Sequence, residues 1–184
     1  DILVMNKNAR EISVEVLGRV LNQGAYSNIA LNHAFSSAQL EKEDVGLVTE
    51  IIYGTLKYLI TIDEILKINM TVPLKKVEHK ILNLLRISIY QLKYLDKVPS
   101  YAVINEAVEL SKKFSKKASG FVNGVLRGYL RKKDVPLTFK NRLDELSKTY
   151  SFPTWMISLF EKQYEDRAIE ILEGLNERPS ITFR

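Results

Sequence analysis

The sequence has no cysteine, two histidines and one tryptophan among its 184 residues, and it contains only eight glycines and five prolines. The lack of cysteine excludes a disulfide framework, a thiolate zinc site, a redox pair and a cysteine nucleophile from this chain. A chain of this length buries roughly 70% of the surface that its unfolded form exposes, so stability requires neither disulfides nor metals. The remaining composition, 46% hydrophobic and 27% charged, predicts a compact soluble chain.

Long apolar runs are also missing. The longest uncharged stretch, residues 20–40, contains three Asn, two Gln, three Ser and one His, which makes insertion into a bilayer prohibitive. The first residues lack a charged segment followed by an apolar one, so we expect no signal peptide. We expect Met5 to be the native first residue, and we expect a cytoplasmic protein without a membrane partner.

Catalytic and metal-binding motifs are absent as well. The sequence contains no G-x-G-x-x-G, no P-loop and no paired spacing of metal ligands. His33 and His79 each lack a ligand partner at helical spacing, so a packed or surface histidine is the favoured interpretation for both. We therefore predict no catalytic residue, no cofactor-binding residue and no metal site in this chain.

Apolar residues recur at helical spacing along nearly the whole chain, which predicts an all-α fold. Gly24 can end the first helix and Ser27 is a favourable N-cap for the second. The spacing of Thr61 and Glu64 has the form of a capping box at a helix start, and Ser100 can cap a later helix. Further helices are predicted over about Glu43 to Leu59, from near Pro73 to Tyr94 or Leu95, and over about Ser119 to Lys132. The helix from Pro73 is apolar on more than one face, so we expect it at the centre of the bundle.

A change in pattern marks the end of this bundle near Asp134-Val135-Pro136. Three weaker helices are predicted beyond it: Arg142 to Tyr150, Pro153 to Tyr164 and Asp166 to Leu175. Residues 180–184 alternate apolar and polar side chains like the first strand of a β-containing domain, which we expect to follow. The predicted organisation is a helical domain of residues 5–134 and a helical linker of residues 135–184.

The net charge of +5 is unevenly distributed. Residues 112–142 contain ten Lys and Arg against the single acid Asp134, giving +9, while the rest of the chain carries −4. A basic segment on a mildly acidic chain is typical of a surface that binds a polyanion. A solvated, lysine-rich helix end and loop is the alternative interpretation.

The helix predicted over Ser119 to Lys132 carries two stripes at four-residue spacing. Gly120, Gly124 and Gly128 form a bare stripe, beside which Arg127 and Arg131 form a basic one. An interior glycine costs roughly 1 kcal/mol relative to alanine, so these glycines indicate close approach by another helix or by a nucleic-acid backbone. We favour a helix. The predicted phosphate contacts are Lys7, Arg10, Lys112, Lys113, Lys116, Lys117, Arg127, Arg131, Lys132 and Lys133.

Three tyrosines, Tyr90, Tyr94 and Tyr101, lie close together in the sequence. Aromatic rings of this kind can stack on the unpaired bases of RNA. Core packing is the favoured interpretation for most of them.

Several motifs occur in a specific order between about Asn6 and Arg131. They are Asn8-Ala9-Arg10, Gly24-Ala25-Tyr26-Ser27-Asn28-Ile29-Ala30-Leu31-Asn32, Glu50-Ile51-Ile52-Tyr53-Gly54-Thr55-Leu56, Asp96-Lys97-Val98-Pro99, Ile104-Asn105-Glu106-Ala107-Val108-Glu109-Leu110 and Phe121-Val122-Asn123-Gly124-Val125-Leu126-Arg127. Together they resemble the N-terminal domain of the RsmB (Sun/Fmu) family of ribosomal RNA methyltransferases, whose fold is similar to that of the antitermination factor NusB. Tyr150-Ser151-Phe152-Pro153-Thr154-Trp155 and Asn176-Glu177-Arg178-Pro179 resemble the segment that joins this domain to the methyltransferase domain.

The resemblance implies a NusB-like helical bundle with a short helical extension. It also implies a role: an RNA-binding and positioning domain of an enzyme that transfers a methyl group from S-adenosylmethionine to C5 of a cytosine in small-subunit ribosomal RNA. This chain has neither the cysteine nucleophile nor a cofactor loop, so the catalytic half is expected elsewhere in the parent enzyme. The expected partners are small-subunit ribosomal RNA and the protein's own C-terminal methyltransferase domain.

Two other hypotheses remain open at this point. The first is a free-standing NusB-like factor that acts in transcription. The second is a helical module that binds its own catalytic domain or another protein and no RNA, and the glycine stripe is the best support for this hypothesis.

Overall fold

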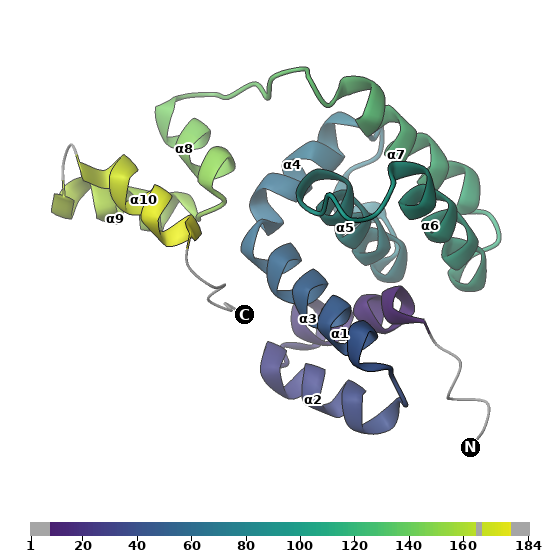
Figure 1. The fold of residues 1–184 in the computed structure, drawn as a ribbon. Coiled ribbons are helices and arrows are strands. Elements are labelled where there is room, and N and C mark those ends of the chain that lie inside the picture. Colours follow the sequence, from purple (N-terminus) through teal and green to yellow (C-terminus); the bar gives the residue numbers. More distant parts are fainter. Residues whose placement is uncertain (1–7, 165–166, 178–184) are drawn as a thin grey trace.

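The structure is a computed structural model that describes residues 8–164 and 167–177. Within these ranges the chain is built from α-helices and short 3-10 turns, with no strand, which confirms the all-α prediction (Figure 1). The expectations for Met5 and Lys7, and for the strand-like residues 180–184, fall outside the described residues.

The first three helices are α1 (Ala9–Gln23), α2 (Ser27–Ser37) and α3 (Lys42–Lys57). Asn8 caps α1, because its side-chain oxygen accepts a hydrogen bond from the Glu11 amide at 2.9 Å, and Gly24 ends the helix at a left-handed φ of 74°. The prediction that Ser27 caps α2 is wrong. The N-cap is Tyr26, whose side chain makes no capping bond, and Ser27 is the buried first residue of the helix.

The middle of the chain forms α4 (Leu59–Ile68), a 3-10 turn (Leu74–Lys76) and α5 (His79–Tyr94). The predicted capping box is wrong, since α4 starts two residues before Thr61 and the Thr61 hydroxyl donates instead to the Lys148 carbonyl oxygen at 2.6 Å. Helix α5 also starts later than predicted, at His79, because Pro73 is the N-cap of the 3-10 turn that precedes it. Its central position is confirmed: α5 contacts α1, α3, α4, α6 and α7.

A helical hairpin completes the bundle. It consists of α6 (Ser100–Phe114) and α7 (Ser119–Lys132), and the bounds of α7 are those predicted from the sequence. The cap of α6 differs from the prediction, since Pro99 rather than Ser100 is its N-cap. Buried apolar side chains of α1 to α7 form one continuous hydrophobic core.

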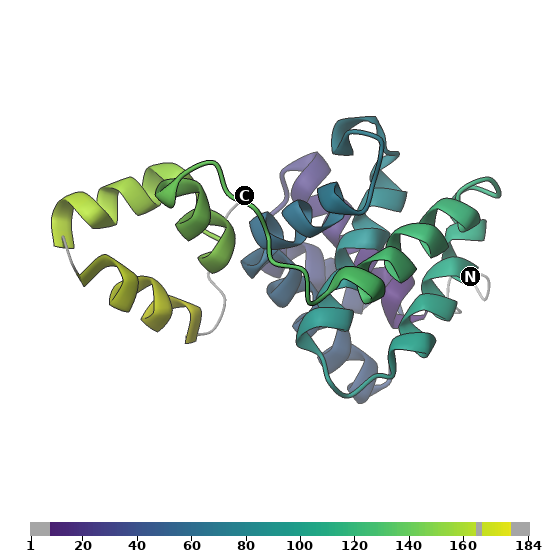
Figure 2. The ribbon, with the colours of Figure 1, turned by 90° about the horizontal axis from the view of Figure 1, so that it is seen from above.

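The extension consists of α8 (Arg142–Tyr150), α9 (Thr154–Tyr164) and α10 (Ala168–Glu177). Its own core is small, with Leu146, Ile157 and Leu172 as its buried residues. Figure 2 shows these three helices as a lobe beside the bundle, connected to α7 by an extended segment.

Polar contacts attach this lobe to α4 at a site that we call the α4–α8 joint, formed by Thr61, Glu64, Asp144, Lys148 and Ser151. The Lys148 Nζ lies 3.2 Å from Glu64 Oε1 and 2.9 Å from Asp144 Oδ2. Ser151, at a left-handed φ of 60°, places its Oγ 3.2 Å from the backbone nitrogen of Ile60, which donates to it. The joint therefore ties α8 directly to the first turn of α4.

No single helix in the described ranges is long and apolar enough to cross a bilayer. Helices α3 and α4 reach that length and composition only together, with a bend of 77° between them. Their inward side chains, including Val48, Ile52 and Leu66, are fully buried in the core of the bundle.

Candidate functional site

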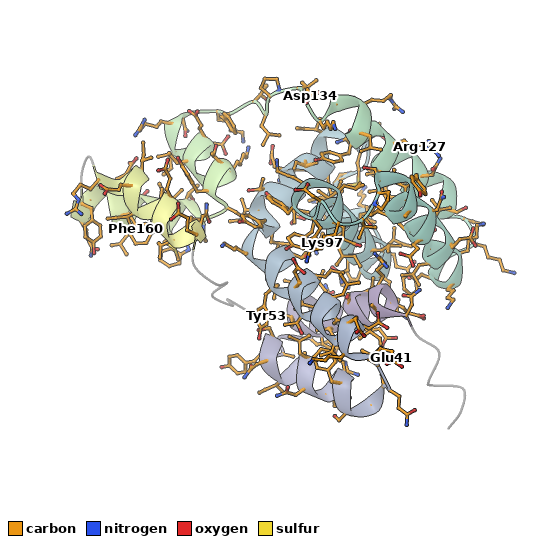
Figure 3. The ribbon with its side chains drawn as sticks, in the orientation of Figure 1. Glu41, Tyr53, Lys97, Arg127, Asp134 and Phe160 are labelled. Carbon is orange, nitrogen blue, oxygen red and sulfur yellow. The ribbon has the colours of Figure 1, made fainter. Side chains whose placement is uncertain are left out.

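The sequence patterns that pointed to function converge on the α6–α7 hairpin. Val122, Val125, Leu126 and Tyr129 anchor α7 to the core. The opposite side of α7 is exposed, and Arg127 lies on its outer side in Figure 3. Residues 119–133 contain no Asp or Glu. Burial of one face thus forces the cations of this helix into solvent.

Six exposed cations in and around α7 define a surface that we call the α7 strip. Its residues are Lys116, Lys117, Arg127, Arg131, Lys132 and Lys133. None of the six has an ion-pair partner among the described residues. The Nε of Arg127 donates to Asn123 Oδ1 at 2.9 Å, which orients this guanidinium while its other N–H groups stay available. Asn123 was not predicted as a site residue, although its spacing of four residues from Arg127 is a sequence signal for such a pair.

The strip is elongated along α7. Lys116 and Lys117 precede α7, whereas Lys132 and Lys133 stand at its other end. At 1.5 Å of rise per residue the two ends are about 20 Å apart. A surface of this length suits an extended polyanion better than a single phosphate group.

Two other predicted cations, Lys112 and Lys113, lie near the end of α6 and have carboxylate partners. The Lys112 Nζ is 2.8 Å from Glu109 Oε1, and both side chains are exposed. The Lys113 Nζ is 3.2 Å from Glu11 Oε2, which is largely buried. Part of their charge is therefore balanced within the protein.

Arg10 does not belong to the α7 strip, because its side chain is largely buried and paired within the bundle. Its Nη1 lies 2.6 Å from Glu106 Oε2, its Nε donates to Gln91 Oε1 at 2.9 Å, and its side chain is only 16% exposed. These contacts connect α1 to α5 and α6. Lys7, the tenth predicted cation, lies outside the described residues.

The favoured interpretation of the glycine stripe, close approach by another helix, is wrong for Gly120 and Gly124. A Cβ added at Gly120 or Gly124 meets nothing within 4 Å among the described atoms, so no helix of the bundle packs there. Only Gly128 is buried, where an added Cβ would lie 3.1 Å from Asn69 Oδ1. The glycine that requires close approach is Gly54, since its added Cβ would lie 2.0 Å from Cζ of Tyr90. The sequence offers no periodic signal for that contact.

Tyr90, Tyr94 and Tyr101 lie in different environments. Tyr90 is buried, and Tyr94 stacks on Tyr58 with ring centroids 4.1 Å apart. Burial, with smaller effects of Glu50 and Tyr58, raises the pKa of Tyr90 to about 12, and burial likewise raises the pKa of Tyr94. Tyr101, in contrast, is 71% exposed. Core packing thus accounts for Tyr90 and Tyr94 and leaves Tyr101 on the surface.

No group of three or more His, Asp or Glu side chains in the described ranges is arranged to hold a metal ion. A cavity of about 370 Å³ lies between the end of α1 and the start of α5, with His79 and Arg86 in its wall. Arg86 is already satisfied there, because its Nε and Nη2 donate to both carboxylate oxygens of Asp63 at 2.8 and 2.9 Å. Lys75, also in the wall of this cavity, is exposed, so the cavity offers no buried charged group without a partner.

Fold and surface together define the class of protein as an all-α bundle whose last hairpin presents a strip of exposed cations. The chain belongs to the NusB family, to which its residues 7–131 match.

The curated relatives of the chain are longer proteins. It is 36% identical over 166 residues to the probable ribosomal RNA small subunit methyltransferase B of Bacillus subtilis, covering 89% of this chain and 37% of that protein. It is 31% identical over 183 residues to the probable ribosomal RNA small subunit methyltransferase B of Synechocystis, covering 96% of this chain and 40% of that protein. The chain therefore spans about 40% of the length of these relatives, and the match extends well beyond the NusB region.

Two solved structures share the fold. The chain in the crystal structure of PH0851 has a TM-score of 0.69 at 18% identity, covering 95% of this chain and 40% of that one. A chain in the crystal structure of a plectonemic RNA supercoil has a TM-score of 0.63 at 22% identity, covering 70% of this chain and 96% of that one. At these identities the likeness establishes the arrangement of the helices.

Proposed function

We propose that this chain is the RNA-binding and positioning domain of a ribosomal RNA cytosine-C5 methyltransferase, acting in the cytoplasm on small-subunit ribosomal RNA. The observation that carries the proposal is the α7 strip, which has no carboxylate partner among the described residues. Exposed Lys and Arg side chains of this kind bind phosphates, and they give affinity and register rather than sequence discrimination. The names of the longer relatives support ribosomal RNA as the polyanion.

The extension favours this proposal over a free-standing NusB-like factor. The NusB family match ends at residue 131, whereas the similarity to the Synechocystis methyltransferase covers 96% of the chain and so includes most of α8 to α10. A helical unit shared with longer enzymes suits a segment that connects the bundle to a catalytic domain. We therefore place the partner methyltransferase domain in the part of the relatives that this chain does not span.

S-adenosylmethionine belongs to that other part of the enzyme. The described residues contain no strand followed by a glycine-rich turn that opens a helix, the arrangement that holds nucleotide-like cofactors in α/β folds. The residues present therefore do not fit this cofactor. No catalytic step is assigned to this chain, and its contribution is to hold and orient RNA.

Charge reversal in the strip tests the proposal. The double variant Arg127→Glu, Arg131→Glu is expected to weaken binding to a small-subunit ribosomal RNA fragment by about tenfold or more, because two phosphate contacts become repulsive. The matched control is Lys42→Glu, Lys162→Glu, which changes the net charge equally at two exposed lysines outside the strip. Filter binding or fluorescence anisotropy at one fixed salt concentration compares them. Equal losses in both double variants, or no binding by the unaltered chain, would contradict the proposal.

A further inference from the structure

Tyr101 is the most exposed large hydrophobic side chain in the described part of the chain, at 71%. Tyr94 stacks on both Tyr58 and Tyr90, whereas Tyr101 has no ring or cation–π partner among the described residues. Leaving a ring of this size in water forfeits the stabilisation that its burial would supply. Neither folding of the bundle nor packing of the hairpin explains its position.

The geometry of the hairpin places this ring at one end of the α7 strip. Helices α6 and α7 are packed neighbours joined by residues 115–118, and they contain 15 and 14 residues. Two antiparallel helices of nearly equal length bring the first turn of one beside the last turn of the other. Tyr101, in the first turn of α6, therefore lies at the end of the hairpin that carries Arg131 and Lys132. Lys133 and Asp134 follow directly after α7, and Asp134 lies above the bundle in Figure 3.

This combination of an exposed aromatic ring and a row of cations indicates a particular ligand chemistry. Cations along a groove or helix hold the phosphates of a nucleic-acid strand, while a free aromatic side chain stacks on a base. A base inside a duplex is already stacked on its neighbours, and the deep major groove of A-form RNA is closed to side chains. Only a single-stranded segment can offer both groups at once.

We infer that Tyr101 stacks on an unpaired base of a single-stranded RNA segment whose backbone follows the α7 strip. The inference rests on the proposed RNA-binding function and adds the class of RNA and the residue that recognises it. Gly120 and Gly124 have open space above them, which lets the strand lie close to the helix between its two basic ends. Tyr101 then fixes the register of the strand, which phosphate contacts alone leave free to slide.

Alanine and phenylalanine substitutions separate stacking from other roles of Tyr101. The probe is a labelled, single-stranded RNA of about 12 nucleotides, within the range of lengths that a single-strand-binding module covers, together with a duplex of the same sequence. Tyr101→Ala is expected to lower affinity for the single strand about tenfold, in the range measured for loss of one base–aromatic stack, and to leave duplex affinity unchanged. Tyr101→Phe keeps the ring and is expected to bind like the unaltered chain.

Tyr26→Ala is the matched control, because Tyr26 is also a surface tyrosine at a helix start, 53% exposed at α2. It is expected to bind both probes normally. The stacking inference is overturned if the unaltered chain binds RNA and Tyr101→Ala binds the single strand equally well, or if Tyr101→Phe is as weak as Tyr101→Ala. It is likewise overturned if Tyr101→Ala loses a protein partner while its RNA affinity is intact. Failure of the unaltered chain to bind either probe refutes the RNA-binding function itself, before any variant is compared.

Discussion

Glycines in this bundle have opposite roles that depend on what surrounds each Cα. Gly54 faces the ring of buried Tyr90, whereas Gly124 faces open space on α7. The first glycine lets α3 and α5 approach closely, because any side chain would occupy the position of the tyrosine ring. Gly124 makes no such close contact, so its main effect is to lower the stability of the helix, as any interior glycine does.

Alanine substitution at these two glycines should therefore change stability in opposite directions. Gly54→Ala is expected to lower the free energy of unfolding by about 1–3 kcal/mol, since the new methyl group forces Tyr90 and the backbone to shift. Gly124→Ala, as the matched control, is expected to raise it by about 0.5–1 kcal/mol. Chemical denaturation followed by circular dichroism measures both. Destabilisation by Gly124→Ala would show that something within the protein occupies the space above that helix.

Individual site residues could be predicted from the sequence only where their environment is local. The exposure of Arg127 and Arg131 follows from the apolar face of their own helix, so periodicity was sufficient. Arg10 has the same charge, but its hydrogen-bond partner Gln91 lies 81 residues away, and no local pattern reports such a contact. The contact of Gly54 with Tyr90 could not be predicted for the same reason, because the two residues are far apart in the sequence.

At the scale of elements, the α4–α8 joint determines how the extension is held. Burial acts to lower the pKa of Lys148, but hydrogen bonds and charges from Asp144 and Glu64 outweigh it and raise the pKa above 10.5. The backbone N–H of Lys140, followed by Lys148, holds the pKa of the Asp144 carboxyl below 3.8. The stability that Asp144 contributes is thus present above pH 3.8 and is lost as the pH falls through its lowered folded pKa. The contribution of Lys148 is present below pH 10.5 and is lost as the pH rises through its raised folded pKa.

Removing the central cation should loosen the extension without unfolding the bundle. Lys148→Ala is expected to reduce the free energy that protects the amides of α8 to α10 by about 1–2 kcal/mol at neutral pH, because Glu64 and Asp144 lose their shared partner. Hydrogen exchange by mass spectrometry checks this, with exposed Lys162→Ala as the control. Equal protection in Lys148→Ala and the unaltered chain would mean that the apolar contacts alone hold the lobe.

Helix positions were largely predictable, whereas the caps were not. The bounds of α7 and α8 follow directly from the apolar spacing of their own residues. Ser27 and Thr61 were misassigned because a hydroxyl that suits a cap can also be buried or serve a distant partner. The Thr61 hydroxyl donates to Lys148, 87 residues away, so tertiary structure overrides its local preference.

At the scale of the whole molecule, positive and negative charge are separated along the chain. A scaffold with a net charge of −4 carries a segment of +9, and folding arranges six of the exposed cations of that segment as a strip about 20 Å long. The sequence alone predicts the charge, while the hairpin geometry determines that Lys116 and Lys133 stand at opposite ends. An extended arrangement of this kind predicts several simultaneous phosphate contacts.

The salt dependence of RNA binding tests this claim most directly. A plot of log affinity against log salt concentration should be a falling straight line for the unaltered chain and a single-stranded RNA. The double variant Arg127→Ala, Arg131→Ala should make the slope shallower by about 1.4, because each lost phosphate contact releases about 0.7 counterion fewer. Lys42→Ala, Lys162→Ala should leave the slope unchanged. A slope that is the same in all three proteins, or an affinity that does not depend on salt, would contradict the assignment of the α7 strip to the RNA backbone.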